Sequence, residues 1–200
     1  MPSQMLAVDV GNPDPRIIEQ VAAVLGAGGV VAAPSDTVYG LLGVNGNERA
    51  RKRLTAIKER EGPFITLVQD IAQARQLAPA APAWVWERLP RVWPGPVTVV
   101  LPVDGSTISL RAPGLPFLDA LLERTGPLWS TSANPPGVPP SETAAGLHAQ
   151  VTSAVDLCVD GGPARTTRPS TLVDLTGMPR VLREGSGDAG PLLDPPPPQT

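Results

Sequence analysis

The sequence is short of the residues that most often supply acid–base catalysis and metal binding. Its 200 residues include one cysteine, Cys158, and one histidine, His148. One cysteine excludes an intrachain disulfide and a cysteine-based zinc site. A Cys–His dyad would need both residues, and a Ser–His–Asp triad would need His148. We predict that His148 lies in a polar, exposed helix over residues 141–150, so we expect a solvated surface histidine.

Long apolar runs are also missing. No window approaches the roughly 18 apolar residues that a membrane-spanning helix needs. The first fifteen residues have no basic start and no long apolar stretch, so the sequence predicts no signal peptide. We therefore expect a soluble, cytoplasmic protein with no membrane partner.

Positive charge is limited and is almost entirely arginine. The chain has 16 basic and 19 acidic residues, a net charge of −3, and its lysines are Lys52 and Lys58. This balance argues against a protein that binds nucleic acid through a generally basic surface, but it allows a local positive cleft. There is no Walker A loop and no G-x-G-x-x-G, because the glycines of 26–29 are wrongly spaced and precede a strand. A nucleotide would therefore be bound by Arg, Lys and hydroxyl groups.

Periodicity and capping residues predict an α/β fold. Asp14, Asn47 and Asp70 are typical helix N-caps, and Pro15 suits a first helical turn. Helices are predicted after these caps and over 115–124 and 141–150, and strands over 30–33, 64–68, 97–102, 108–111, 128–130, 155–159, 171–175 and 180–183. Because the elements do not alternate strictly, we expect one domain, residues 1–185, with an open twisted mixed sheet. The Pro-rich tail, 186–200, is predicted to be disordered.

Several polar segments lie where strands or helices end. Residues 34–40 (PSDTVYG) follow a buried strand and could line a ligand crevice or form an ordinary capped turn. Lys58 and Arg60 could clamp a phosphate or complement a helix dipole. Residues 128–134 (LWSTSAN) could bind an anion or form a polar turn. The residues alone leave these alternatives open.

A fourth set consists of polar residues at or near the ends of predicted strands. Its members are Thr107, Arg111, Ser170, Thr171 and Arg183. Side chains at strand ends can converge on one face of a sheet. Taken with the other segments, they predict an anion-binding α/β domain whose chemistry the residues do not specify.

Taken together, these segments resemble the YrdC/TsaC family of threonylcarbamoyl-AMP synthases. The resemblance covers residues 15–185, and the short, single-domain form is the closer match in length. It is carried in order by 28–41 (GGVVAAPSDTVYGL), 57–60 (IKER), 93–98 (WPGPVT), 111–113 (RAP), 131–137 (TSANPPG), 161–162 (GG), 170–174 (STLVD) and 182–185 (LREG). Each segment is weak alone, but the ordered set is highly specific.

The resemblance implies an enzyme, a nucleotidyltransferase, and a fold built around a large positive cavity. L-threonine, bicarbonate or CO2, and ATP would give threonylcarbamoyl-AMP and pyrophosphate, with Mg²⁺ bound through the phosphates. The product would serve N6-threonylcarbamoyladenosine formation at position 37 of tRNA, through a downstream tRNA threonylcarbamoyltransferase machinery. Such a reaction depends on positioning and charge neutralisation, so the lack of a His or Cys catalyst is expected.

The resemblance also assigns site residues. The catalytic set at the nucleotide would be Lys58, Arg60, Ser132 and Asn134, and Thr107 and Arg183 would also contact ATP. L-threonine would be held by Thr37, Arg111, Ser130 and Ser170, with Arg111 pairing its carboxylate.

Three positions depart from the family pattern. The loop after Arg60 is short, and it places Glu61 beside the expected phosphate path. Ser35 stands where the family usually has threonine, and Pro136 where it usually has serine, so one hydroxyl is lost. These changes bear on specificity and on activity.

Two other readings use the same residues. A non-catalytic module of the same fold could bind RNA weakly, and its phosphate contacts would be salt-dependent. The carbamoyl-transferring relative inside hydrogenase-maturation proteins normally sits beside an acylphosphatase-like domain and Cys-rich zinc fingers, and this sequence shows neither. The −3 charge and the presence of Lys58, Arg60, Ser132 and Asn134 favour the enzyme.

Overall fold

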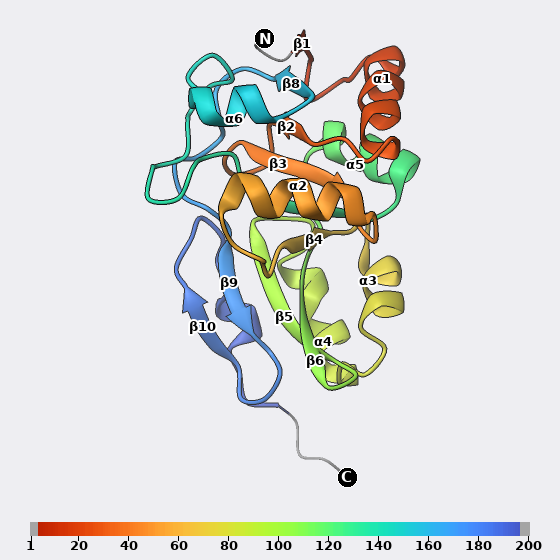
Figure 1. The fold of residues 1–200 in the computed structure, drawn as a ribbon. Helices are drawn as coiled ribbons and strands as arrows, with labels where there is room; N and C mark the ends of the chain where they lie inside the picture. Colours follow the sequence, from red (N-terminus) through yellow and green to blue (C-terminus); the bar gives the residue numbers. More distant parts are fainter. Residues whose placement is uncertain (1–3, 197–200) are drawn as a thin grey trace.

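One sheet runs through the whole molecule, and its strands pair in both directions (Figure 1). The computed structural model describes residues 4–196. The strands are β1 (Gln4–Ala7), β2 (Val31–Ala33), β3 (Gly40–Val44), β4 (Ile65–Leu67), β5 (Val97–Val103), β6 (Ser106–Arg111), β7 (Leu128–Ser132), β8 (Leu157–Asp160), β9 (Thr171–Asp174) and β10 (Arg180–Arg183). Their order in the sheet is β1-β8-β2-β3-β7-β4-β6-β5-β9-β10.

Pairing directions confirm the predicted mixed sheet. The parallel pairs are β1/β8, β2/β8, β4/β6 and β5/β9. The pairs β2/β3, β3/β7, β4/β7, β5/β6 and β9/β10 are antiparallel. The helices that flank the sheet are α1 (Pro15–Gly26), α2 (Glu48–Lys58), α3 (Ile71–Leu77), α4 (Ala83–Arg88), α5 (Pro116–Thr125) and α6 (Ala149–Ala154), with short 3-10 turns η1 (Leu89–Arg91) and η2 (Gly190–Leu192).

Side-chain alternation along β2 shows how the two faces of the sheet are covered. Val31 and Ala33 pack into the core made with α1 and α5, whereas Ala32 packs into the core made with α2 and α6. Successive side chains of a strand point to opposite faces, so both faces are buried at this end of the sheet. At the other end, α3, α4 and η2 pack on β5, β6 and β9. In Figure 1, α1 and α5 lie side by side at the first end.

The three predicted helix caps are confirmed. The side chain of Asp14 accepts a hydrogen bond from the amide of Arg16 at the start of α1. Asn47 accepts from the amides of Arg49 and Ala50 in α2, and Asp70 caps α3 in the same manner. These bonds satisfy amides that have no partner within the helix.

The helix predicted over 141–150 is wrong. Residues 141–148 form turns, in which Ser141 and Thr143 bond to nearby backbone groups, and α6 begins only at Ala149. Short hydroxyl side chains compete in this way with helical hydrogen bonds. His148 is exposed, as predicted, and its Nδ1 accepts from the amide of Gln150 to cap α6.

Two strands were not expected from the sequence, β1 and β3. In β3, Gly40 and Gly43 weaken the usual strand pattern. Gly43 is explained by packing: a Cβ there would lie 3.0 Å from the Cβ of Ala50 in α2. This glycine lets α2 approach the sheet closely, and α2 ends beside the site described below.

The segment after β10 packs against the sheet, so the disorder predicted for 186–200 does not extend over its first part. The amide of Gly185 donates to Thr171 Oγ1, which donates to the carbonyl of Gly187. A Cβ on Gly185 would lie 2.3 Å from Thr171 N, which shows how closely the two backbones meet. Leu192 is fully buried, and Arg88 binds the carbonyl of Asp194. Residues 197–200 of the predicted tail lie outside the described residues.

Candidate functional site

A polar pocket lies on the face of the sheet that carries α1 and α5, beyond the end that they cover. Strand register places Ser130, Ile65 and Ser109 in one row on β7, β4 and β6, and all three line the pocket. The next row is Leu128, Leu67 and Arg111, of which the two leucines belong to the apolar core. Arg111 therefore sits where the core meets the pocket.

The pocket has a volume of about 300 Å³, at the small end of the range for ligand sites. Its lining comes from segments far apart in the sequence: Ser35, Thr37, Val38, Tyr39, Gly40, Arg60, Pro63, Ile65, Ser109, Arg111, Ser130, Thr131, Ser132, Pro169, Ser170, Leu172 and Arg183. Three of these side chains are guanidinium groups and none is acidic. The electrostatics of the pocket thus favour an anionic ligand.

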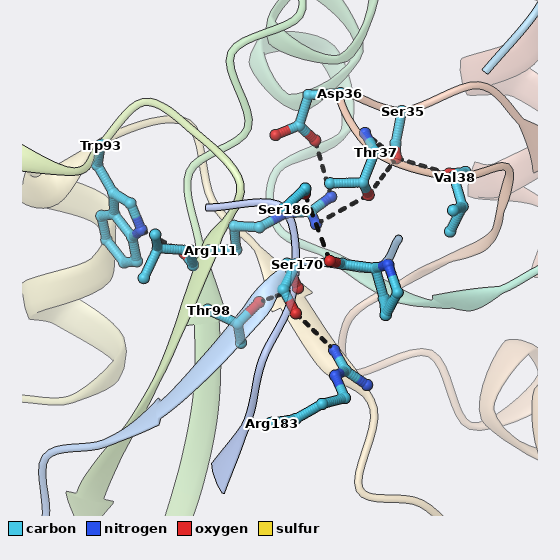
Figure 2. Close-up of polar contacts among 12 residues, drawn as sticks. Ser35, Asp36, Thr37, Val38, Trp93, Thr98, Arg111, Ser170, Arg183 and Ser186 are labelled. Atoms are coloured by element: carbon cyan, nitrogen blue, oxygen red, sulfur yellow. Dashed lines mark hydrogen bonds and ion pairs between the residues drawn. The ribbon is translucent and has the colours of Figure 1, made fainter. Parts of the chain in front are cut away.

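Arg111 is buried, and two consecutive residues, Asp36 and Thr37, hold its guanidinium group. Its Nη2 lies 2.9 Å from Asp36 Oδ1, and its Nη1 donates to Thr37 Oγ1 at 3.3 Å (Figure 2). The side chains of Arg111 and Asp36 are each only 5% exposed. Burial lowers the pKa of the Arg111 guanidinium, and the negative charge of Asp36 opposes that shift.

Thr37 belongs to a turn that its own hydroxyls stabilise. Ser35 Oγ donates to the carbonyl of Val38 at 2.7 Å and lies 3.0 Å from Thr37 Oγ1. The amide of Thr37 donates to Ser35 Oγ at 3.1 Å. The sequence left open whether residues 34–40 form a turn or line a crevice. In the structure they do both: hydroxyl groups stabilise the turn, and the turn forms part of the pocket wall.

Ser170 is fixed from behind by β5. Its Oγ lies 2.8 Å from Thr98 Oγ1, and both side chains are buried (Figure 2). Its carbonyl accepts from Arg183 Nη2 at 2.9 Å. The β9/β10 register shifts between Val181 and Arg183, which brings Arg183 opposite Leu172, a pocket residue. Irregularities of this kind re-aim a side chain. Burial and the charge of Arg111 both lower the pKa of Arg183.

Lys58 is buried at the end of α2 and reaches across to the segment that follows β7. Its Nζ donates to the carbonyls of Ser132 and Asn134, at 3.0 and 2.6 Å. Ser132 Oγ and Asn134 Oδ1 lie 3.5 and 3.4 Å from the same nitrogen. Burial, with a smaller contribution from the charge of Arg60, lowers the pKa of Lys58 to about 8. No carboxylate among residues 4–196 forms an ion pair with this ammonium.

These contacts bear on the two readings of Lys58 and Arg60. The ammonium of Lys58 binds carbonyls of another segment rather than those at the end of its own helix. Arg60 lies past the helix end, donates to the carbonyl of Pro63 at 3.2 Å and lines the pocket. Arg60 thus lies where it could meet an anion in the pocket, whereas the Lys58 ammonium is engaged by backbone carbonyls and does not line the pocket.

The structure brings most of the predicted site residues together. Thr37, Arg60, Arg111, Ser130, Ser132, Ser170 and Arg183 line the pocket. Lys58 and Asn134 lie just behind Ser132, and the Asn134 amide binds the carbonyl of Val138. Thr107 is exposed near the far end of β6 and does not line the pocket, whereas Ser109, two residues closer, does.

Several contributors to the site were missed. Ser109 could have been found from the two-residue period of β6, because it shares a face with Arg111. Tyr39 donates to the carbonyl of Gly162 at 2.6 Å and ties a distant loop to the pocket wall. Asp36 and Thr98 act on other site residues, and nothing in a single sequence marks such pairings.

Within residues 4–196, no group of three or more His, Cys, Asp or Glu side chains could hold a metal ion. No helix in that part of the chain is long and apolar enough to cross a membrane.

Comparisons with known proteins identify the family of this chain. A family model described as Sua5/YciO/YrdC, telomere recombination, matches residues 23–185. A relative named threonylcarbamoyl-AMP synthase, from Stutzerimonas stutzeri, is 33% identical over 170 residues, covering 79% of this chain and 92% of that protein.

Two solved structures are similar along most of the chain. The crystal structure of E. coli YciO has a TM-score of 0.85 at 28% identity, and the match covers 94% of this chain and 98% of that one. The structure of P. abyssi Sua5 complexed with L-threonine has a TM-score of 0.85 at 29% identity, covering 92% of this chain and 58% of that one. From the extent of the family match and the identity to the curated relatives, the chain belongs to the Sua5/YciO/YrdC family.

Proposed function

We propose that this protein is an L-threonylcarbamoyladenylate synthase, a nucleotidyltransferase that makes threonylcarbamoyl-AMP and pyrophosphate. The observation that carries the proposal is the convergence of Arg60, Arg111 and Arg183, with hydroxyls from several strands, on one pocket beside the buried Lys58. Relatives named threonylcarbamoyl-AMP synthase and a Sua5 structure complexed with L-threonine support it.

The pocket offers two regions with different chemistry. Thr37, Arg111, Ser130 and Ser170 would hold L-threonine, with the guanidinium of Arg111 on its carboxylate. Lys58, Arg60, Ser132 and Asn134 would hold the ATP phosphates, and Arg183 would also contact ATP. The structure does not bring Thr107 to the pocket, so its contact with ATP stays a prediction.

The reaction needs little proton transfer from the protein. The amine of L-threonine adds to CO2 with loss of a proton to solvent, or to bicarbonate with loss of water, and gives a carbamate. A carbamate oxygen then attacks the α-phosphorus of ATP, the bond to the β-phosphate oxygen breaks, and pyrophosphate leaves. The cationic side chains stabilise the charge that builds up on the phosphate oxygens and hold the two substrates in reach of each other.

Mg²⁺ fits this site as part of the nucleotide. The described residues hold no cluster of acidic ligands for a metal of the protein's own, so we propose that Mg²⁺ arrives bound to ATP phosphate oxygens. We further propose that the product is consumed by the tRNA threonylcarbamoyltransferase machinery in the cytoplasm.

The competing reading, an RNA-binding module without catalysis, is less well supported. The guanidinium of Arg111 is buried in the pocket, so an RNA backbone passing over the surface could not reach it.

Substrate dependence tests the proposal directly. Pyrophosphate release, measured with a coupled phosphate assay, is expected only when ATP, bicarbonate and L-threonine are all present, and threonylcarbamoyl-AMP should appear by mass spectrometry. Equal turnover with L-serine, or with no amino acid, would count against the assignment. A salt-sensitive RNA shift without any adenylate product would favour the RNA-binding module instead.

The pKa of Lys58 predicts how ATP binding depends on pH. Because the ammonium is the form that attracts phosphate, the affinity for ATP measured by calorimetry should fall as the pH rises through about 8. Stability should change in the opposite direction. The unfolded chain keeps this proton up to the ordinary value of 10.5, so between these two pKa values it binds more protons than the folded protein. The contribution of Lys58 to stability therefore increases with pH.

In the Lys58→Met variant, both the fall in ATP affinity and the rise in stability with pH that Lys58 causes should disappear. An unchanged pH profile for ATP binding in this variant would show that another group is responsible.

A further inference from the structure

Asp36 stands behind the pocket rather than in its wall. It is not among the lining residues, yet its carboxylate is 95% buried and lies 2.9 Å from Arg111 Nη2. Neither carboxylate oxygen has a hydrogen-bond partner in the part of the chain that the structure describes. Figure 2 shows Asp36 and Thr37 both facing the end of the Arg111 side chain. In that part of the chain, the ion pair of Asp36 is with Arg111 alone.

A second carboxylate lies near enough to Asp36 to feel its charge. Asp119, in the first turn of α5, has its pKa raised by burial and by the negative charge of Asp36. It forms no ion pair with Arg111. Asp119 is thus a neighbour of similar chemistry that does not contact the guanidinium, which makes it a useful control.

Arg111 has few other means of being held in place. Its row on the sheet continues into Leu67 and Leu128, which offer no polar contact. Of its three guanidinium nitrogens, Nη1 donates to Thr37, Nη2 pairs with Asp36, and Nε is buried without a partner. An arginine has five N–H donors in a fixed plane, so fixing two nitrogens fixes the direction of all the remaining donors.

We propose that Asp36 is a positioning residue that orients the Arg111 guanidinium, so that the remaining N–H groups of Nη1 and Nη2 are presented to the α-carboxylate of the amino-acid substrate. This inference rests on the proposed function, in which Arg111 binds L-threonine. Without Asp36, the guanidinium would keep a single polar contact, to Thr37, and its positive charge would lack a buried counterion. Small displacements of such a group are costly, because bidentate contacts depend on the angle as well as the distance.

The test compares two ligands that differ only at the carboxylate. Binding of L-threonine and of L-threoninamide is measured by calorimetry on the wild-type chain and on Asp36→Asn. We expect Asp36→Asn to weaken L-threonine binding by at least about ten-fold and to change L-threoninamide binding by less than about two-fold. In turnover assays the KM for L-threonine should rise while the KM for ATP stays unchanged. A merely structural role would weaken both ligands alike.

Two further variants complete the design. Asp119→Asn, the matched control, should bind L-threonine as the wild type does. Asp36→Glu keeps the negative charge if Asp36→Asn does not fold, and by moving the carboxylate one methylene it should show the same selective loss. Wild-type affinity for L-threonine in Asp36→Glu, or in a folded Asp36→Asn, would overturn the inference.

The same measurements separate this inference from the proposed function. A wild-type chain that binds L-threonine but makes no adenylate would refute the synthase and leave the role of Asp36 standing. A wild-type chain that binds no L-threonine would overturn both.

Discussion

Replacing Lys58 with methionine is expected to lower the rate of threonylcarbamoyl-AMP formation by roughly 30- to 5,000-fold while the chain stays folded. This range corresponds to about 2–5 kcal/mol of transition-state stabilisation, as expected for a lost charged contact to phosphate. Methionine fills a similar volume, so the buried site at the end of α2 keeps its packing. Adenylate formation is measured by mass spectrometry, and folding by circular dichroism.

Lys52 provides the matched control, because it is the other lysine of the chain and lies exposed on the same helix. Lys52→Met should keep wild-type activity. If Lys58→Met also kept activity within a few-fold of the wild type, the carbonyl contacts of Lys58 would have to be read as purely structural.

Replacing Arg111 with methionine should destabilise the fold as well as abolish the binding of L-threonine. The substitution leaves the Asp36 carboxylate buried and without a counterion, a change that costs about 3–5 kcal/mol in comparable buried pairs. Chemical unfolding in urea, followed by tryptophan fluorescence, measures this loss directly. Arg124→Met, which removes an exposed partner of Glu19, should cost much less, because surface ion pairs contribute about 0–1 kcal/mol.

A double variant distinguishes charge burial from packing. Adding Asp36→Asn to Arg111→Met removes the buried charge that has no counterion. At least half of the free energy of unfolding lost in Arg111→Met should therefore return. Binding of L-threonine should not return, because the guanidinium is still missing. If the double variant were less stable than Arg111→Met alone, the instability would come from lost packing around the arginine rather than from the uncompensated carboxylate.

Local signals predicted much of the fold correctly. Asp14, Asn47 and Asp70 mark the true helix starts, and every predicted strand is present within a few residues. The failures have local causes too. Strand β3 was not predicted because its glycines weaken the strand pattern. Around Ser141 and Thr143, hydrogen bonds between hydroxyl and backbone groups take the place of the hydrogen bonds of a helix.

The site was less accessible to sequence reasoning because it depends on pairing between distant segments. Motifs supplied Arg111, Thr37 and Ser170, but the order of the strands decides that they face each other. Thr107 illustrates the limit. It shares a face with Ser109 and Arg111, and only the length of β6 shows that it lies too far along the strand to line the pocket.

The close meeting of Gly185 with the backbone at Ser170 and Thr171 has a practical consequence. The family match stops at residue 185, so a boundary chosen by similarity alone would cut the chain there. The segment that follows, residues 186–192, binds Thr171 at the start of β9 and so holds the neighbouring Ser170, which lines the pocket. This segment ends at Leu192, which is buried in the core. Truncation at that boundary would loosen the amino-acid side of the pocket from behind, although no residue touching the ligand had been removed.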